Sequence, residues 1–191
     1  MSSNIKIEFA LTGSFCTFEK TVALMKLMKE KGIDILPFMS FNAYNLDTKF
    51  GKACDFIKRI ESICEKKIIS DIVSAEPIGP QKLADIMLVL PCTGNTLAKL
   101  RNGIYDTPVT LAVKSHLRNE RPVVIGISTN DALSNTAKNI GELLNYRNLF
   151  FVPFGQDDCI NKPRSIVCDF DKAYETVIAA SEGRQLQPML I

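Results

Sequence analysis

Residues 86–90 read Ile86-Met87-Leu88-Val89-Leu90, with an apolar side chain at every position. A strand that is apolar on both faces suits the middle of a parallel sheet that is covered by helices. Further apolar runs predict strands on either side of it in the chain, at 5–11, 33–39, 123–127 and 149–152. Helical periodicity separates these runs, at 18–31, 50–64, 96–102, 107–119, 137–144 and 173–182. This alternation predicts an α/β fold, a three-layer sandwich with a doubly wound, mostly parallel sheet.

The composition is that of an ordinary globular protein. The 191 residues are 46% hydrophobic and 23% charged, which excludes a disordered chain, a collagen-like chain and a disulfide scaffold. With 23 basic and 21 acidic residues the formal net charge is +2, and no basic stripe of the kind that binds nucleic acid stands out. No apolar run approaches the ~20 residues that span a bilayer, and the N-terminus does not have the pattern of a signal peptide. We therefore expect neither a nucleic-acid nor a membrane partner.

No internal repeat, low-complexity tract or linker divides the chain, so the simplest interpretation is one domain over residues 1–191. Residues 183–191 follow a glycine break and end in apolar side chains. They are expected to form a C-terminal strap packed on the same core. A contact with a neighbouring protomer is the alternative.

The titratable residues offer little material for familiar catalytic centres. The six cysteines show no Cys-x-x-Cys spacing, so we expect reduced thiols in a cytosol rather than disulfides or a metal site. Cys16 and Cys92 fall in the expected cleft and either could be redox-active, although small size alone explains Cys92. The one histidine, His116, lies in a helical stretch, where a surface or partly buried side chain is a better interpretation than a general base. A Ser-His-Asp triad therefore lacks its histidine.

Polar segments follow all five predicted strands, at 12–14, 40–42, 91–96, 128–131 and 153–158. In an open parallel sheet, ligands bind beyond the carboxyl ends of the strands. Small hydroxyl and amide residues let backbone N–H groups and short side chains surround an anion there. Helix capping explains any one of these segments alone. All five on one edge predict a binding cleft.

The first of these segments, Thr12-Gly13-Ser14-Phe15-Cys16-Thr17, matches neither the dinucleotide fingerprint nor the Walker pattern. It offers one flexible glycine and three hydroxyl side chains ahead of a helix, which suits a single phosphate. A mononucleotide with one terminal phosphate therefore fits better than NAD or ATP.

Two segments resemble the FMN-binding flavoprotein family, which includes the phosphopantothenoylcysteine decarboxylases. Thr12-Gly13-Ser14 is similar to the opening loop of that family, and residues 83–100 look like its central signature, an Ala-Asp pair, a buried strand and a polar loop. In that loop, Cys92 and Gly94 stand where the family has two alanines. The resemblance covers residues 5–152 and implies a Rossmann-like fold with bound FMN.

The resemblance also implies which residues would hold the cofactor. Gly13 and Ser14 would bind the flavin phosphate, and Asn130 falls where the family has an asparagine that could contact the ring or a substrate carboxylate. Ser40 is equally well explained as a helix cap, and Asn130 as a turn residue. The full set is Thr12, Gly13, Ser14, Ser40, Thr93, Asn95, Thr96, Ser128 and Asn130.

Departures from the decarboxylases weaken the implied chemistry of that group. Their catalytic histidine lies just ahead of the Ala-Asp pair, and no histidine occurs in residues 75–84. The family's Pro-Ala-Met-Asn loop has become Ile127-Ser128-Thr129-Asn130, and tryptophan is absent from the chain. A prenyltransferase is also disfavoured, because its Ser-Gly-Ser loop is not found between residues 72 and 84. No catalytic residue can be assigned on this basis.

Further segments, among them 126–133 and 151–158, resemble one branch of the family along its full length. That branch implies a cytoplasmic protein, in the mother cell of a sporulating bacterium, that works together with a second, different polypeptide on a small dicarboxylate. Two functions stay open: an FMN-dependent redox component that works with NAD(P) held by the partner, and a non-catalytic flavin-binding or scaffolding partner. A family-type decarboxylase comes last. Relatives with such a cleft assemble, so a homo-oligomer is expected.

A dicarboxylate requires arginine or lysine in its site. Lys49, Arg101, Lys114 and Arg118 lie near the predicted loops, and the sequence does not favour one of them. Asp157 and Asp158 are adjacent, and a solvated loop is the simpler interpretation of both.

Overall fold

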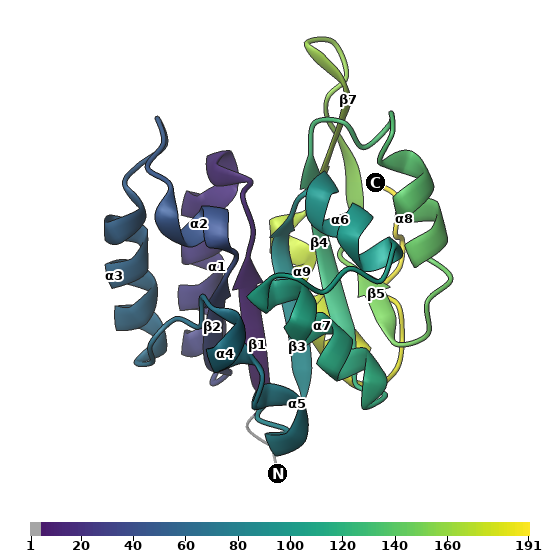
Figure 1. Ribbon diagram of the computed structural model, residues 1–191. Coiled ribbons are helices and arrows are strands. Elements are labelled where there is room, and N and C mark those ends of the chain that lie inside the picture. Colours follow the sequence, from purple (N-terminus) through teal and green to yellow (C-terminus); the bar gives the residue numbers. More distant parts are fainter. Residues whose placement is uncertain (1–4) are drawn as a thin grey trace.

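The structure is a computed structural model that describes residues 5–191. Its centre is β3 (Ile86–Cys92), whose seven side chains are all buried. β1 (Lys6–Leu11) and β4 (Val123–Thr129) pair with β3 in parallel, β2 (Asp34–Met39) pairs in parallel with β1, and β5 (Leu149–Phe151) with β4. All five predicted strands are thus confirmed, and within residues 5–191 they belong to one seven-stranded sheet (Figure 1).

The remaining two strands, β6 (Phe154–Asp158) and β7 (Lys162–Cys168), form an antiparallel hairpin. β7 also pairs antiparallel with the end of β4, where Ser128 lies opposite Val167. The prediction of a polar turn at 153–158 is therefore wrong. The hairpin projects beyond the rest of the sheet, so its side chains stay largely in water and show no apolar run that would mark a strand (Figure 1).

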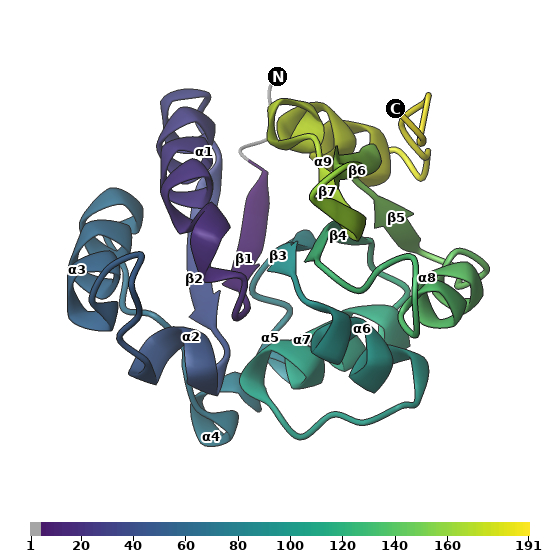
Figure 2. The same cartoon turned by 90° about the horizontal axis from the view of Figure 1, so that it is seen from above.

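Helices cover both faces of the sheet, which confirms the predicted three-layer α/β sandwich (Figure 2). α1 (Phe18–Glu30) and α9 (Ala173–Ser181) lie on one face, and α6 (Gly94–Arg101) and α7 (Pro108–Arg118) on the other. α3 (Ala53–Cys64) packs beside α1 and β2, and α8 (Ala137–Leu143) packs against α6. The sequence did not predict the short elements η1 (Phe15–Thr17), α2 (Phe41–Asn45), α4 (Ile72–Ala75), α5 (Ile78–Gln81) and η2 (Phe170–Lys172).

Local chemistry sets the ends of these helices. Thr107 and Thr110 form a capping box at the start of α7, with Pro108 in the first turn, where a missing N–H costs nothing. Helix α3 begins three residues later than predicted, because the Asp47 carboxylate accepts a hydrogen bond from the backbone N–H of Ala53 at 2.8 Å. Phe50, expected on the apolar face of that helix, lies ahead of it and is 46% exposed.

A buried pair of polar side chains interrupts the apolar core. Glu8 on β1 is fully buried, His116 on α7 is 2% exposed, and His116 Nε2 lies 3.1 Å from Glu8 Oε2. The interpretation of His116 as a surface or partly buried histidine is therefore wrong. Its helix presents it to the sheet, where the carboxylate on β1 is its partner. Such a pair is favourable only while both partners are present.

We expect His116→Leu to lower the free energy of unfolding by about 1–3 kcal/mol, because it leaves the buried Glu8 carboxyl group without its partner. The double variant Glu8→Met, His116→Leu should recover most of that loss, since no unpartnered polar group remains there. Urea denaturation of the wild type and the two variants measures both effects. A double variant no more stable than His116→Leu would contradict this account of the pair.

The C-terminal residues contact the exposed edge of β6 and the end of β5. The backbone N–H of Phe154 donates to the carbonyl of Met189 at 2.9 Å, and the Gln185 side chain bonds both backbone groups of Phe151. Gly155 leaves room for this approach, because a Cβ there would lie 2.2 Å from the Ile191 carbonyl oxygen.

Among residues 5–191, no helix combines the length and the hydropathy that crossing a bilayer requires.

Candidate functional site

The strand order places a crevice between β1 and β3. Along the sheet the parallel strands run β2-β1-β3-β4-β5, so the chain turns to opposite faces after β1 and after β3. α1 follows β1 on one face, and α6 follows β3 on the other. Ligands bind at such a reversal in open α/β sheets, beyond the carboxyl ends of the strands.

Hydrogen bonds tie the loops at this edge together. Thr12 Oγ1 donates to the carbonyl of Pro91 at 2.8 Å and accepts from the backbone N–H of Thr93 at 3.0 Å. Ser14 Oγ and Ser128 Oγ share a hydrogen bond of 2.8 Å. The segments after β1, β3 and β4 are therefore held in one rim.

Two adjoining pockets lie along this rim and share Gly13, Thr93 and Asn95. The smaller has a volume of about 350 Å³ and the larger about 760 Å³, both within the usual range of ligand pockets. All nine residues predicted to bind a cofactor line one pocket or both. Four of the five polar segments thus converge as predicted, and from the fifth, which is a strand, Asp157 reaches the larger pocket.

Seven of the ten residues that line the smaller pocket carry hydroxyl or amide side chains, namely Thr12, Ser40, Asn42, Thr93, Asn95, Thr96 and Thr107. Gly13, Phe41 and Lys99 complete the lining. Ser40 and Thr93 are helix caps as well, since Ser40 Oγ accepts from Ala43 N at 3.4 Å and Thr93 Oγ1 from Thr96 N at 3.3 Å. Lys99, which the sequence analysis missed, pairs with Asp106 at 2.5 Å. Short neutral donors beside one ammonium group suit an anion with several oxygens.

The larger pocket combines apolar walls with charged groups. Phe15, Phe50 and Val167 line it, together with Ser128 and Asn130 at the end of β4. Its charged lining residues are Lys49, Asp131, Asp157 and Lys162. Flat apolar surfaces with a few polar groups between them suit a planar ring system.

The loop after β4 explains why Gly94 stands where the family has alanine. Asp131 accepts hydrogen bonds from Thr129 Oγ1 at 2.6 Å and from Thr136 Oγ1 at 2.8 Å. A Cβ at position 94 would lie 2.7 Å from Asp131 Oδ1 and 2.8 Å from Thr136 Oγ1. The close approach of these two side chains to the start of α6 therefore requires glycine.

We expect Gly94→Ala to destabilise the protein by about 1–3 kcal/mol, because the new methyl group overpacks this contact. Gly141→Ala is the matched control, since a Cβ there meets nothing within 4 Å and α8 gains helix propensity. Thermal unfolding of both variants measures the difference. Equal stabilisation by the two substitutions would show that Asp131 does not pack tightly against α6.

Of the four basic residues named as candidates for a carboxylate, only Lys49 lines either pocket. Arg101 pairs with Glu142 at 2.6 Å, Lys114 lies over the Tyr105 ring, and Arg118 lies beside Gly79. Lys162, which the sequence analysis did not single out, lines the larger pocket because β7 folds back beside β4. Asp158 accepts hydrogen bonds from its own hairpin turn instead, and these lower its pKa.

The cysteines divide into an exposed and a buried set. Cys16 is exposed at the larger pocket, whereas Cys92 is fully buried. Burial raises the pKa of the Cys92 thiol and raises that of Cys168 to about 12, so both stay protonated. Small size in the core therefore explains Cys92. Within residues 5–191, no cluster of three or more histidine, cysteine or acidic side chains could hold a metal ion.

At pH 8 we expect Ellman's reagent to modify the exposed thiols Cys16, Cys54 and Cys159 in the native protein. Cys64, Cys92 and Cys168 should react only after unfolding, because they are buried and burial raises their pKa values. The thiol count before and after addition of guanidinium chloride checks this. Rapid native modification of Cys92, seen by peptide mapping, would contradict it.

Comparison with known proteins identifies the family of this chain. The flavoprotein family model matches residues 1–180, and the chain belongs to that family. It is similar to the B subunit of dipicolinate synthase of Bacillus subtilis (strain 168), at 42% identity over 186 residues, or 97% of this chain and 93% of the relative. This is the branch of the family that the sequence resembles.

Solved structures give the same result. The crystal structure of the dipicolinate synthase B subunit from Bacillus halodurans C is 41% identical, with a TM-score of 0.90 over 99% of this chain and 97% of that one. Burkholderia xenovorans DmrB, solved in complex with FMN, shares the fold alone, with a TM-score of 0.64 at 17% identity over 80% of this chain and 89% of that one.

Proposed function

We propose that the chain is the B subunit of a dipicolinate synthase and that it binds FMN at the rim after β1, β3 and β4. It would act with the A subunit of that enzyme in the oxidation of dihydrodipicolinate to dipicolinate during sporulation. The observation that carries this proposal is that two pockets adjoin at three shared residues, the smaller rich in hydroxyl and amide side chains and the larger including aromatic and aliphatic ones. A polar pocket beside a more apolar one suits FMN, in which a phosphate is joined to a flat ring system.

The residues fit FMN by the chemistry of their donors. Thr12, Gly13, Ser40, Thr93 and Thr96, which all line the smaller pocket, would surround the phosphate. A side chain at position 13 would fit without a clash, since a Cβ there would be in ordinary van der Waals contact with the Phe15 ring at 3.7 Å. Ser14, Asn95, Ser128 and Asn130 would line the ring in the larger pocket. Bound FMN supplies a hydride acceptor, and the protein supplies binding and orientation.

The proposed partner, substrate, assembly and location rest on the relative's name and on family resemblance. The partner would be a dipicolinate synthase A subunit that holds NAD(P), and the substrate a small dicarboxylate. The chain would form a homo-oligomer in the cytoplasm of the mother cell. The chain would act as one domain with residues 183–191 as its strap, which the contacts of Met189 and Gln185 support.

A second function has an observation in its favour. No histidine lies in residues 75–84, and His116 is engaged with Glu8 in the core rather than in either pocket. A chain without a histidine at its cleft would serve as a non-catalytic flavin-binding or scaffolding component that activates the A subunit. Family-type decarboxylation is the least favoured function for the same reason.

The visible spectrum of the purified chain separates flavin binding from its absence. A yellow protein, or a colourless one that takes up added FMN, supports the proposal, whereas a chain that ignores FMN refutes it. Following dihydrodipicolinate oxidation in the presence of the A subunit, with and without flavin on this chain, then separates a redox component from an activator.

Gly13→Asp tests the position of the phosphate. We expect FMN affinity to fall by about 100-fold or more, because a carboxylate would face the phosphate at close range. Gly13→Asn has nearly the same shape without the charge and is the matched control. Fluorescence titration with FMN measures both. Equal affinities of the two variants would refute the assignment of this loop to the phosphate.

A further inference from the structure

Two ammonium groups enter the larger pocket from separate parts of the chain. Lys49 lies on the segment between α2 and α3, and Lys162 is the first residue of β7. In Figure 1 these segments rise on opposite sides of the ends of β1 and β3. Both lysines nevertheless line the same pocket.

Lys49 is available to a ligand. Among residues 5–191 it has no carboxylate within ion-pairing distance, and its Nζ lies 5.2 Å from the centre of the Phe50 ring, which lines the same pocket. An ammonium over an aromatic face is oriented without being neutralised. Lys49 is therefore free to bind an anion.

Lys162 forms an ion pair but remains exposed to solvent. Its Nζ pairs with Asp157 at 2.8 Å, and the side chains of the two residues are 58% and 36% exposed. The hydrogen bond to Asp157 keeps the pKa of Lys162 above its ordinary value, so the group stays protonated. An exposed pair of this kind contributes little stability, so a ligand carboxylate can join or replace Asp157. Asp131, the other carboxylate of the pocket, is occupied by the Thr129 and Thr136 hydroxyls.

We infer that Lys49 and Lys162 form a two-point clamp for a small aromatic dicarboxylate, each ammonium group taking one carboxylate across the larger pocket. The inference rests on the proposed function for the class of substrate and adds the residues that recognise it. The ring of the dicarboxylate would lie beside the flavin, in the part of the larger pocket that the flavin leaves open next to its apolar side chains. Selectivity follows, because a ligand with one carboxylate leaves one ammonium group without its partner.

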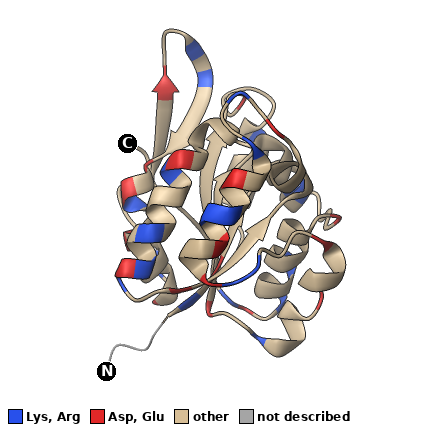
Figure 3. Cartoon of the chain, turned by 90° about the vertical axis from the view of Figure 1, so that its left-hand side faces the viewer, with Lys and Arg blue, Asp and Glu red and all other residues tan. Residues whose placement is uncertain are grey.

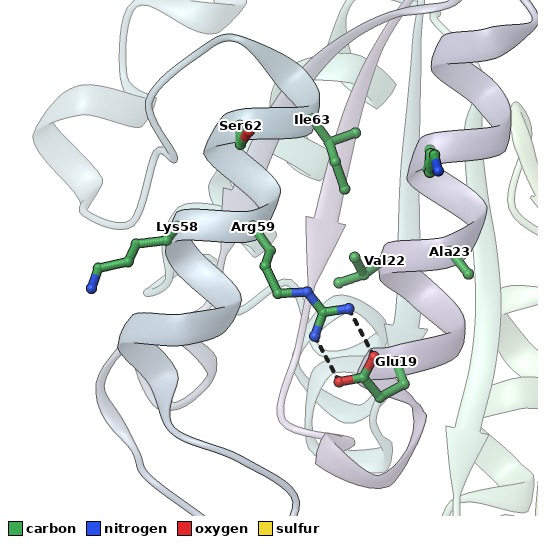
Figure 4. Close-up of a pocket in the computed structure, with 8 residues that line it drawn as sticks. Glu19, Val22, Ala23, Lys58, Arg59, Ser62 and Ile63 are labelled. Carbon is green, nitrogen blue, oxygen red and sulfur yellow. Dashed lines mark hydrogen bonds and ion pairs between the residues drawn. The ribbon is translucent and has the colours of Figure 1, made fainter.

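The groove between α1 and α3 is the competing cationic site. It is lined by Lys26, Lys58 and Arg59, and charged residues are frequent on that side of the molecule (Figure 3). Arg59, however, already binds both carboxylate oxygens of Glu19, at 2.7 and 2.8 Å, and Lys58 points away from the groove (Figure 4). The groove between α1 and α3 therefore does not present two free cationic side chains to one ligand.

Calorimetric titration of the full chain, supplemented with FMN, tests the clamp with pyridine-2,6-dicarboxylate and pyridine-2-carboxylate as probes. We expect the diacid to bind at least about tenfold more tightly than the monoacid, the order expected of one charge-assisted hydrogen bond. Lys49→Met and Lys162→Met should each weaken diacid binding by about tenfold or more and abolish the preference. Lys114→Met, a lysine outside both pockets, should bind like the wild type.

The results that would contradict the clamp differ from those that would contradict the proposed function. Wild-type protein that does not bind the diacid, or unchanged diacid affinity in Lys49→Met and Lys162→Met, overturns the clamp. Loss of binding in Arg59→Met with retention in Lys49→Met overturns it in favour of the groove. Flavin content is read from the visible spectrum of the same samples. Absence of flavin refutes the proposed function, whereas a yellow protein indifferent to both lysine substitutions refutes the clamp alone.

Discussion

The parallel pairing of β1, β3 and β4 is the constraint on which the other features depend. Because the three strands run in one direction, their polar ends meet at one edge, and Thr12 bonds both Pro91 and Thr93 across the reversal in strand order. Ser14 and Ser128 add the third loop. A rigid, close-packed sheet below this edge holds short side chains where no single loop could hold them.

The sequence predicts a strand correctly wherever helices bury both faces of that strand. Ile86–Leu90 is apolar throughout, as suits a strand covered by helices on both faces, and shorter apolar runs mark the other parallel strands. The hairpin of β6 and β7 could not be found in this way. Its strands pair mainly with each other and project into water, so that polar residues such as Gln156 and Asp157 occupy strand positions.

The site could be predicted as far as it is made of residues that immediately follow strands. All nine residues that were singled out lie within a few positions of a strand end, and all line the two pockets, because the strand ends determine where they lie. Lys99 and Lys162 could not be predicted, since a turn of helix α6 and the return of β7 bring them in. His116 was misjudged because its partner Glu8 lies on β1, far away in the sequence, and only the packing of α7 on the sheet brings the two together.

A crystal structure of the FMN complex tests the central claim most directly. The account predicts that the flavin phosphate lies between residues 12–14 and 93–96 and that the ring occupies the larger pocket beside Ser128 and Asn130. A flavin bound in the groove between α1 and α3, or a phosphate in contact with neither loop, would contradict it.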